Sequence, residues 1–318
     1  MHSRGGFLVR EQSWITYLVT SEDIGKTVEQ IAREKLSVSG RMLQRLTRSK
    51  GIQLNRKNAF LKREVKAGDS VSVRIADTSP ALAATGTGPQ SLQEEVKLDI
   101  LYEDEHFVIV NKPAGLMVHP VKKDQTSTLV HALTAYWLQK GQKLAPHPIH
   151  RLDKETSGAV FIAKSSYAHQ LADRLLREGD LQREYLAVVT QQLQHEQGTI
   201  DAPIMRDPSH STKRKVGKKG EPAVTHYQVL ARSQEATLVR VQLETGRTHQ
   251  IRVHFQSIGH PLVGDTLYGA RRTGFRRQAL HAYQLSFTHP LLQQKMTIKA
   301  PLPEDLAAYV KDTFDFTL

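Results

Sequence analysis

From residue 96 onward, short apolar runs alternate with amphipathic segments, which predicts strands separated by helices. The segment 236–244 is the clearest strand, since Val239, Val241 and Leu243 fall on one face of an extended chain. We predict further strands at 96–102, 106–111, 159–164, 183–190, 223–231, 283–288 and 295–299, and helices at 127–140, 166–178 and 248–258. Because strands outnumber the helices that could cross between them, we expect an α+β domain over residues 94–318, with a mixed, largely antiparallel central sheet flanked by helices.

Residues 20–76 follow a different pattern and predict a separate, small α/β module. Apolar residues recur at helical spacing between positions 28 and 36 and give one apolar face. A second helix is expected to begin after Ser39, as its N-cap, and to end at Gly51. Short strands are expected at 52–55 and 70–75.

The positive charge of the chain is concentrated in this module. The whole chain has 44 Lys and Arg against 32 Asp and Glu, a net charge of +12. Within residues 20–76, 13 basic residues minus 6 acidic residues give +7. Arg41, Arg45 and Arg48 line one face of the second helix, which has no acidic residue. We therefore predict that these three arginines contact an RNA backbone.

The module resembles the small alpha-L RNA-binding module named after ribosomal small-subunit protein four. The resemblance rests on Ser39-Gly40-Arg41 at the start of the second helix and on the stretches 51–55 and 65–71. It departs from the usual Val-Asn-Gly at Leu54-Asn55-Arg56. The next stretch, 77–93, is rich in Ala, Thr, Gly and Pro without periodicity, so we predict a flexible linker.

The composition of the chain excludes several kinds of site and favours a nucleic-acid partner. The chain has no cysteine, which excludes disulfides, thiolate metal sites and cysteine nucleophiles. It has no apolar run long enough to span a bilayer, and residues 1–10 lack the apolar core of a signal peptide, so we expect a cytoplasmic protein. The excess positive charge favours a polyanionic partner, most simply nucleic acid, although a merely soluble basic protein would share it. The 15 histidines show no metal-ligand spacing, so no metal is expected.

One loop carries the strongest candidate for chemistry. Asp153 lies between Arg151 and Lys154, and the turn residues Thr156-Ser157-Gly158 lead into the apolar run 159–163. The pattern places a carboxylate among cations on a loop before a buried strand, and catalytic groups commonly occupy such loops. For this window alone, a surface turn whose aspartate pairs with its neighbours is the alternative.

Three further stretches combine tight turns with charged or reactive side chains. Lys112 precedes a Pro-Ala-Gly turn in residues 111–120, and Arg183-Glu184-Tyr185 begins a strand. In residues 245–254 a Thr-Gly turn places Arg247 before a helix. Each stretch alone is ambiguous, because an arginine at a helix start is more often a surface residue than a catalytic one.

Together these motifs resemble the RluA family of pseudouridine synthases. The resemblance rests on residues His150-Arg151-Leu152-Asp153, Arg183-Glu184-Tyr185 and 246–254. Gly264-Asp265, Leu267-Tyr268-Gly269 and Leu280-His281-Ala282 match further family elements, and the match covers residues 95–305 in unbroken order. The resemblance implies the pseudouridine synthase fold and an enzyme that isomerises uridine in structured RNA to pseudouridine without a cofactor.

The resemblance also implies roles for three residues. Asp153 would be the nucleophile or base, which attacks the ribose or the uracil ring or removes a ribose proton, and all three routes stay open. Arg247 would form an ion pair with Asp153. Tyr185 would pack on the target uracil, flipped out of its stack, and serve in the late deprotonation at carbon 5. The other residues expected to bind substrate are His150, Arg151, Lys112, Thr156, His249, Gln250 and Arg252.

A second basic segment lies within residues 206–220. Lys213, Arg214 and Lys215 stand among Ser, Gly and Pro, which predicts a mobile loop that touches the RNA backbone, with a solvated loop as the alternative. Large-subunit ribosomal RNA is the favoured substrate and transfer RNA the alternative, and we expect a monomer. The rival function is a non-catalytic RNA-binding or ribosome assembly factor on the same fold. Such a factor has no need of Asp153, Tyr185 and Arg247 together.

Overall fold

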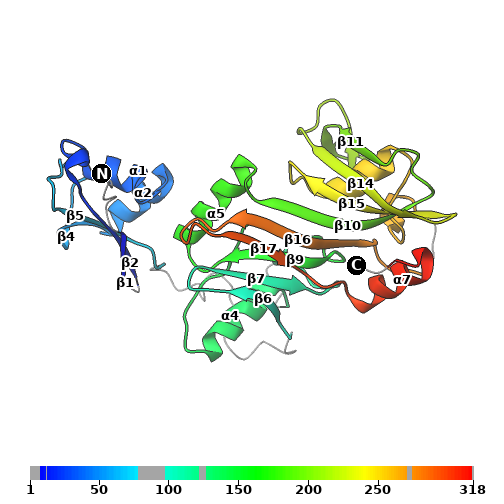
Figure 1. Ribbon diagram of the computed structural model, residues 1–318, viewed down its shortest axis with the longest axis horizontal. Coiled ribbons are helices and arrows are strands. Elements are labelled where there is room, and N and C mark those ends of the chain that lie inside the picture. Colours follow the sequence, from blue (N-terminus) through cyan, green and yellow to red (C-terminus); the bar gives the residue numbers. More distant parts are fainter. Residues whose placement is uncertain (1–7, 12, 78–96, 122–126, 271–273, 317–318) are drawn as a thin grey trace, which may run out of the picture.

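The structure is a computed structural model that describes residues 8–11, 13–77, 97–121, 127–270 and 274–316. Within them, a small N-terminal module and a larger sheet domain lie side by side, and helix α5 of the larger domain (Ser166–Glu178) faces the module (Figure 1). Except for Asp77, the linker predicted at 77–93 lies outside the described residues. Among the described residues, none of the helices has the length and apolar character needed to span a bilayer.

The N-terminal module consists of a five-stranded sheet and two helices. The strands lie in the order β1 (Leu8–Glu11), β2 (Trp14–Leu18), β5 (Ser70–Arg74), β3 (Ile52–Leu54) and β4 (Lys57–Asn58), and the helices are α1 (Val28–Glu34) and α2 (Gly40–Arg48). Both predicted helices are confirmed, and Ser39 caps α2 by accepting a hydrogen bond from the Met42 backbone N at 3.3 Å. Because β1 and β2 precede residue 20, the sheet begins earlier in the chain than predicted.

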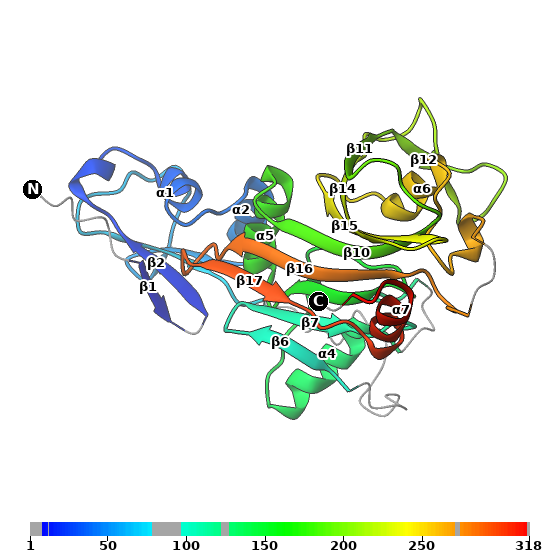
Figure 2. The same ribbon diagram turned by 45° about the vertical axis from the view of Figure 1, so that its right-hand side comes forward.

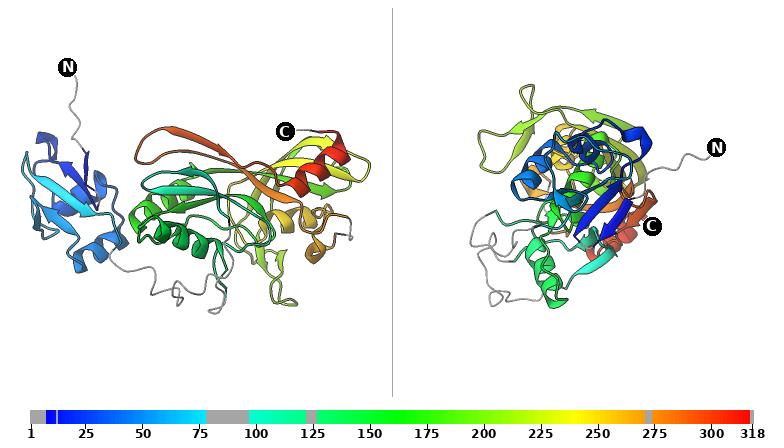
Figure 3. Two further views of the ribbon diagram at one scale, coloured as in Figure 1. Left: turned by 90° about the horizontal axis from the view of Figure 1, so that it is seen from below. Right: turned by 90° about the vertical axis from the view of Figure 1, so that its left-hand side faces the viewer.

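The larger domain is built on a ten-stranded sheet, and its predicted mixed, largely antiparallel character is confirmed. Its main path runs β11 (Gln197–Asp201), β14 (Val224–Arg232), β15 (Ala236–Leu243), β10 (Gln182–Thr190), β16 (Leu280–Thr288), β9 (Ser157–Ala163), β7 (Phe107–Lys112) and β6 (Asp99–Glu103), while β17 (Lys295–Lys299) pairs with β16 and β8 (His147–Pro148) with β9. Neighbouring strands of the described residues run antiparallel, except β9 and β16, which are parallel. Figure 3 shows this sheet extending away from the module.

Helices α4 (Leu129–Gln139), α5 and α6 (Gln250–Ser257) confirm three predicted spans. Leu129, Leu133 and Trp137 of α4 are fully buried, which matches their spacing of four residues. The patterns did not predict strand β11, the C-terminal helix α7 (Glu304–Phe314) or the hairpin of β12 (Ile204–Arg206) and β13 (Arg214–Val216). The hairpin was not predicted because each strand has only three residues, too few to show apolar alternation.

Close contact between two central strands brings the predicted motifs together. Ala282 of β16 pairs with Gly158 of β9 on one side and with Tyr185 of β10 on the other. Gly158 has φ +114°, and a Cβ there would lie only 2.2 Å from the Ala282 carbonyl oxygen, so this approach requires glycine. The register therefore fixes the loop that carries Asp153 close to the start of β10.

Candidate active site

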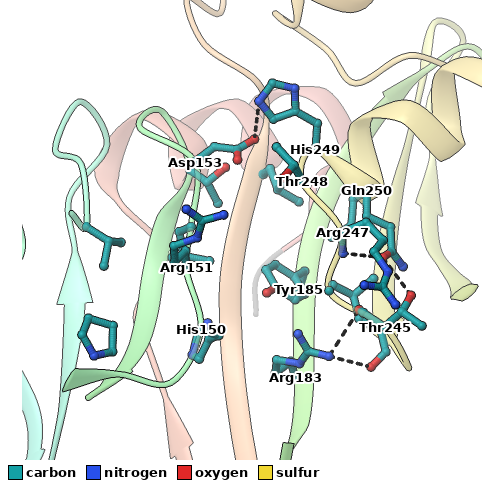
Figure 4. Close-up of a pocket in the computed structure, with 18 of the residues that line it drawn as sticks. His150, Arg151, Asp153, Arg183, Tyr185, Thr245, Arg247, Thr248, His249 and Gln250 are labelled. Carbon is teal, nitrogen blue, oxygen red and sulfur yellow. Dashed lines mark hydrogen bonds and ion pairs between the residues drawn. The ribbon is translucent and has the colours of Figure 1, made fainter. Parts of the chain in front are cut away.

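A cavity of about 830 Å³ opens where the loop before β9, the start of β10 and the loop between β15 and α6 converge (Figure 4). Three sequence motifs that lie far apart along the chain meet at its wall. The lining includes His150, Arg151, Asp153, Thr156, Arg183, Tyr185, Arg247, His249, Gln250 and Arg252. All the predicted catalytic residues and most of the predicted substrate-binding residues thus surround one site.

Asp153 is held by an arginine that the sequence did not single out as its partner. Arg252 Nη1 of α6 donates a hydrogen bond to Asp153 Oδ2 at 2.8 Å. The Arg252 side chain is 8% exposed, whereas that of Asp153 is 26% exposed. A buried cation thus fixes one carboxylate oxygen, while the carboxylate as a whole stays open to the cavity.

Arg252 is itself clamped from behind. Its Nε and Nη2 donate to the two oxygens of buried Asp265 at 2.6 and 2.9 Å, and its guanidinium lies 4.9 Å from the centre of the Tyr268 ring. Burial opposes the positive charge of Arg252, but the hydrogen bonds and charge of Asp265, together with Asp153, raise its pKa. Asp265 and Tyr268 stood in the family motifs, but the sequence did not predict that they hold the partner of Asp153.

The predicted ion pair between Arg247 and Asp153 is wrong in this structure. Arg247 Nη1 lies 2.6 Å from Glu221 Oε2, and its Nε donates to the Pro222 carbonyl oxygen at 3.0 Å. Figure 4 shows Arg247 across the cavity from Asp153. The cause lies in the intervening His249, whose left-handed backbone (φ 60°) redirects the chain before α6 begins.

His249 lies between Asp153 and Tyr268. Its Nε2 is 3.8 Å from Asp153 Oδ2 (Figure 4). A 2.8 Å hydrogen bond joins its Nδ1 to the Tyr268 hydroxyl. Burial lowers the pKa of His249, more than the Asp153 charge raises it. The imidazole is therefore mainly neutral at pH 7, and the charge on Asp153 is balanced chiefly by Arg252.

Tyr185 presents its ring to the cavity from a buried position. The residue is 5% exposed and belongs to the main apolar core. The register between β10 and β16 shifts between Glu184 and Tyr185, and irregularities of this kind re-aim side chains beside active sites. Burial raises the pKa of Tyr185, so its phenol is protonated at neutral pH.

The turn before α6 is fixed by two buried side chains. Gln250 Oε1 accepts from the Thr245 hydroxyl at 2.8 Å and from the Arg247 backbone N at 2.9 Å, and its Nε2 donates to the Val224 carbonyl oxygen at 2.9 Å. Arg183 Nη2 donates to the Thr245 carbonyl oxygen at 3.2 Å. Because the amide of Gln250 is engaged by the protein, its geometry fits positioning of the turn better than the predicted contact with substrate.

His150 and Thr156 lie at the cavity wall, but the hydrogen bonds of their side chains go to the protein. His150 Nε2 accepts a hydrogen bond from the Phe161 backbone N at 3.2 Å, and burial lowers the pKa of His150 to about 3. The Thr156 hydroxyl accepts from Gln278 Nε2 at 3.2 Å. Both residues therefore support the loop of Asp153, whereas Arg151 on the same loop is exposed at the cavity wall.

Lys112 does not line the cavity, in contrast to its predicted contact with substrate. Its side chain is fully buried, and Nζ donates to the carbonyl oxygens of Pro113, Leu116 and Lys154 at 2.8, 2.7 and 3.1 Å. Three acceptors match the three protons of an ammonium group. Burial lowers the pKa of Lys112 to about 7, although the charges of Glu155 and Asp153 raise it. Lys112 thus pins its own turn to the loop of Asp153.

We expect Lys112→Met to destabilise the protein. The substitution leaves three carbonyl oxygens without this donor, and one unsatisfied buried group costs about 1–3 kcal/mol. We therefore expect the free energy of unfolding to fall by about 2–5 kcal/mol in urea titration. Lys154→Met removes an exposed side chain from the same loop and should change it by less than about 0.5 kcal/mol. Equal stability of the two variants would contradict the pinning role.

The predicted RNA-backbone residues occupy two places. Arg45 Nη1 donates to the Ser166 hydroxyl of α5 at 2.7 Å, whereas Arg41 and Arg48 are exposed. The basic segment near residue 214 forms the β12–β13 hairpin, and its strand β13 contacts α6. Lys213 Nζ lies 5.6 Å from the centre of the Tyr268 ring. The Arg214 backbone N donates to the Tyr268 hydroxyl at 2.9 Å, and Lys215 lies 3.8 Å from Asp207. Across the described ranges, no group of three or more His, Asp or Glu could hold a metal ion.

Comparison with known proteins identifies the class of enzyme. Residues 106–257 match the family model described as RNA pseudouridylate synthase. The uncharacterized RNA pseudouridine synthase YhcT of Bacillus subtilis is 37% identical over 291 residues, which cover 91% of this chain and 94% of the relative. Ribosomal large subunit pseudouridine synthase D of Nitrosomonas europaea is 40% identical over 85% of this chain and 78% of the relative. The solved structure of human RNA Pseudouridylate Synthase Domain Containing 1 is 28% identical and superimposes with a TM-score of 0.56, covering 70% of this chain and 90% of the human one.

The fold and site are therefore those of an RNA pseudouridine synthase. Within that class, the chain belongs to the RluA family, since its motifs and its relatives of the D type agree over most of its length. The family supplies the reaction, in which the bond between ribose and nitrogen 1 of uracil is replaced by a bond to carbon 5.

Proposed function

We propose that this enzyme isomerises uridines of large-subunit ribosomal RNA, with Asp153 as the nucleophile or base and without a cofactor. The observation that carries the chemical assignment is the 2.8 Å contact between Asp153 and a buried, clamped Arg252. A fixed cation holds one carboxylate oxygen and leaves the carboxylate open to the cavity, which an attacking or proton-accepting group requires. The choice of RNA rests on relatives named ribosomal large subunit pseudouridine synthase D.

Each remaining residue of the site has a proposed task that follows from its position. Tyr185 packs on the flipped uracil, because a buried aromatic ring offers a flat apolar face next to the carboxylate. Its raised pKa supports this packing role more than direct proton removal, since the phenol holds its proton at neutral pH. Exposed Arg151 and half-exposed Arg247 are suited to phosphates at the mouth of the cavity.

A non-catalytic RNA-binding factor remains the rival function. It is disfavoured because the partners of Asp153 are themselves supported. Asp265 and Tyr268 hold Arg252, and Tyr268 also binds His249. Phosphate binding alone needs no such support for an acidic side chain. We propose that the enzyme works in the cytoplasm, as a monomer.

The proposed substrate can be tested with purified protein. RNA labelled with tritium at carbon 5 of uracil releases the label when a uridine is isomerised. We expect release from large-subunit ribosomal RNA transcripts and none from bulk transfer RNA transcripts. Release from transfer RNA alone would overturn the proposed substrate and leave the proposed chemistry standing, and release from neither RNA would favour the non-catalytic factor.

A further inference from the structure

Helix α5 joins the N-terminal module to the catalytic cavity. Tyr167 and Leu171, in its first half, are 1% and 5% exposed and are part of the module's apolar core. Leu176 and Arg177, near its end, line the cavity. The step from Leu171 to Arg177 corresponds to about 9 Å along a helix axis. Figure 2 shows α2 of the module beside the same helix.

Three hydrogen bonds join helix α5 to the corner between α1 and α2, in addition to the contact between Arg45 and Ser166. The Tyr167 hydroxyl donates to the Leu36 carbonyl oxygen at 2.9 Å. The Ser39 backbone N donates to Gln170 Oε1 at 2.9 Å, and Gln170 Nε2 donates to the Ser37 carbonyl oxygen at 3.1 Å. The side-chain amide of Gln170 thus binds both a backbone donor and a backbone acceptor of this corner. A module that slid or rotated on α5 would lose both hydrogen bonds.

Asp77 connects this contact to the strand that leads to the catalytic loop. Its carboxylate accepts hydrogen bonds from the Ser166 backbone N at 3.1 Å and from the Ser166 hydroxyl. A further hydrogen bond, of 2.9 Å, joins it to His147 Nε2, and Arg45 Nη2 lies 3.8 Å away. His147 belongs to β8 and precedes Asp153 by six residues. The last described residue of the N-terminal part is therefore fastened to the catalytic domain at two points.

We propose that the module is held at a fixed place on α5, and that Tyr167, Gln170 and Asp77 position it relative to the cavity. The inference rests on the proposed binding of RNA by the module, through the exposed Arg41 and Arg48 of α2. A tethered module would offer every uridine within reach of its linker. With a fixed module, only uridines at one distance and direction from the RNA segment bound by the module can reach the catalytic cavity. The contact with α5 is then a determinant of which uridine is modified.

The absence of cysteine allows the fixed position to be measured directly in the full chain. Cysteines introduced at exposed Phe60 of the module and exposed Gln139 of α4 can carry a pair of spin labels. We expect one narrow distance distribution without RNA, and a broad one when Tyr167→Phe and Gln170→Ala are combined. Glu178→Gln, at the exposed far end of α5, is the matched control and should leave the distribution narrow. A broad distribution in the otherwise unaltered protein would overturn the proposal.

Site choice gives the functional test, and circular dichroism checks that each variant is folded. We expect the combined Tyr167→Phe and Gln170→Ala variant to modify a short target stem-loop at a rate within about twofold of the unaltered protein, because one site suffices for that RNA. On long ribosomal RNA, its preference for the target over neighbouring uridines should fall about tenfold. An unchanged preference would overturn the positioning role.

A second variant tests the binding of RNA by the module separately from its fixed position on α5. Arg41→Gln combined with Arg48→Gln should weaken binding to long RNA and reduce the slope of log affinity against log salt by about 1.4–1.8 for two lost phosphate contacts. The preference for the target uridine on long RNA should fall together with the affinity, because a fixed module selects a uridine only while it binds the RNA. The distance distribution of the spin labels should stay narrow, because the contact with α5 is intact. If affinity and slope are unchanged, binding of RNA by the module is wrong. If affinity and slope fall but the preference for the target uridine is unchanged, the module does not select the site, and the positioning proposal is wrong.

Discussion

Replacement of Asp153 by Asn is expected to abolish isomerisation and to leave the binding of RNA nearly intact. The amide has the same shape and can still accept the hydrogen bond from Arg252, which lies 2.8 Å from Oδ2 in the native protein. It lacks the negative charge that covalent attack or proton removal requires. Loss of a residue that carries the chemistry typically lowers turnover by about 10⁴-fold or more.

The measurement for Asp153→Asn is single-turnover release of tritium at saturating RNA, with filter binding in parallel. We expect no detectable release and a dissociation constant within a few-fold of the native value. Arg151→Gln, two residues away on the same loop and exposed, serves as a control that should weaken binding without stopping turnover. Turnover of Asp153→Asn within about tenfold of the native rate would remove Asp153 from the chemistry.

The second large effect is expected for Arg252→Lys. Arg252 donates to both oxygens of Asp265 and to Asp153 at once, and a lysine ammonium cannot reproduce that planar fork. Asp265 is 2% exposed, so the lost contact leaves a buried carboxylate poorly compensated, at a cost of about 3–5 kcal/mol. Misdirection of Asp153 should lower kcat by about 10²–10³-fold, as for the loss of one preorganised polar contact at a reacting group.

Arg247→Lys is the matched control for this prediction. Arg247 pairs with Glu221, and both side chains are partly exposed, at 39% and 70%, so the pair contributes little to stability. We expect near-native melting and kcat for Arg247→Lys, with any effect confined to KM. Thermal unfolding and steady-state rates of both variants decide the question. If Arg247→Lys were the more damaging change, the partner of Asp153 in the working enzyme would be Arg247 after all.

The contrast between these arginines shows where sequence patterns stop being informative about the site. Both lie within residues 247–252, directly after the turn signal Thr245-Gly246. Which of them reaches Asp153 depends on the left-handed backbone of His249, and that conformation is uncommon for a residue other than glycine. By contrast, the apolar run 159–163 predicted its buried strand correctly, because a continuous apolar segment has few other places to go.

Other differences have the same origin in tertiary contacts. The Lys-Pro turn suggested that Lys112 meets substrate, but its burial follows from two loops that converge only in the folded chain. The span of helix α5 was predicted, yet the pattern could not tell that Tyr167 and Leu171 cover the N-terminal module. Periodicity identifies a face to be buried, and the partner of that face is set by the whole fold.

Pseudouridines should be mapped in total RNA from three strains of a host that carries the gene. One strain has the native gene, the second lacks it, and the third carries Asp153→Asn at the same locus. We expect at least one pseudouridine of large-subunit ribosomal RNA to be present in the first strain and absent from the other two, with equal amounts of protein in the first and third. A map that is identical in all three strains, or a pseudouridine restored by Asp153→Asn, would contradict the assignment of Asp153 as the residue that modifies this RNA.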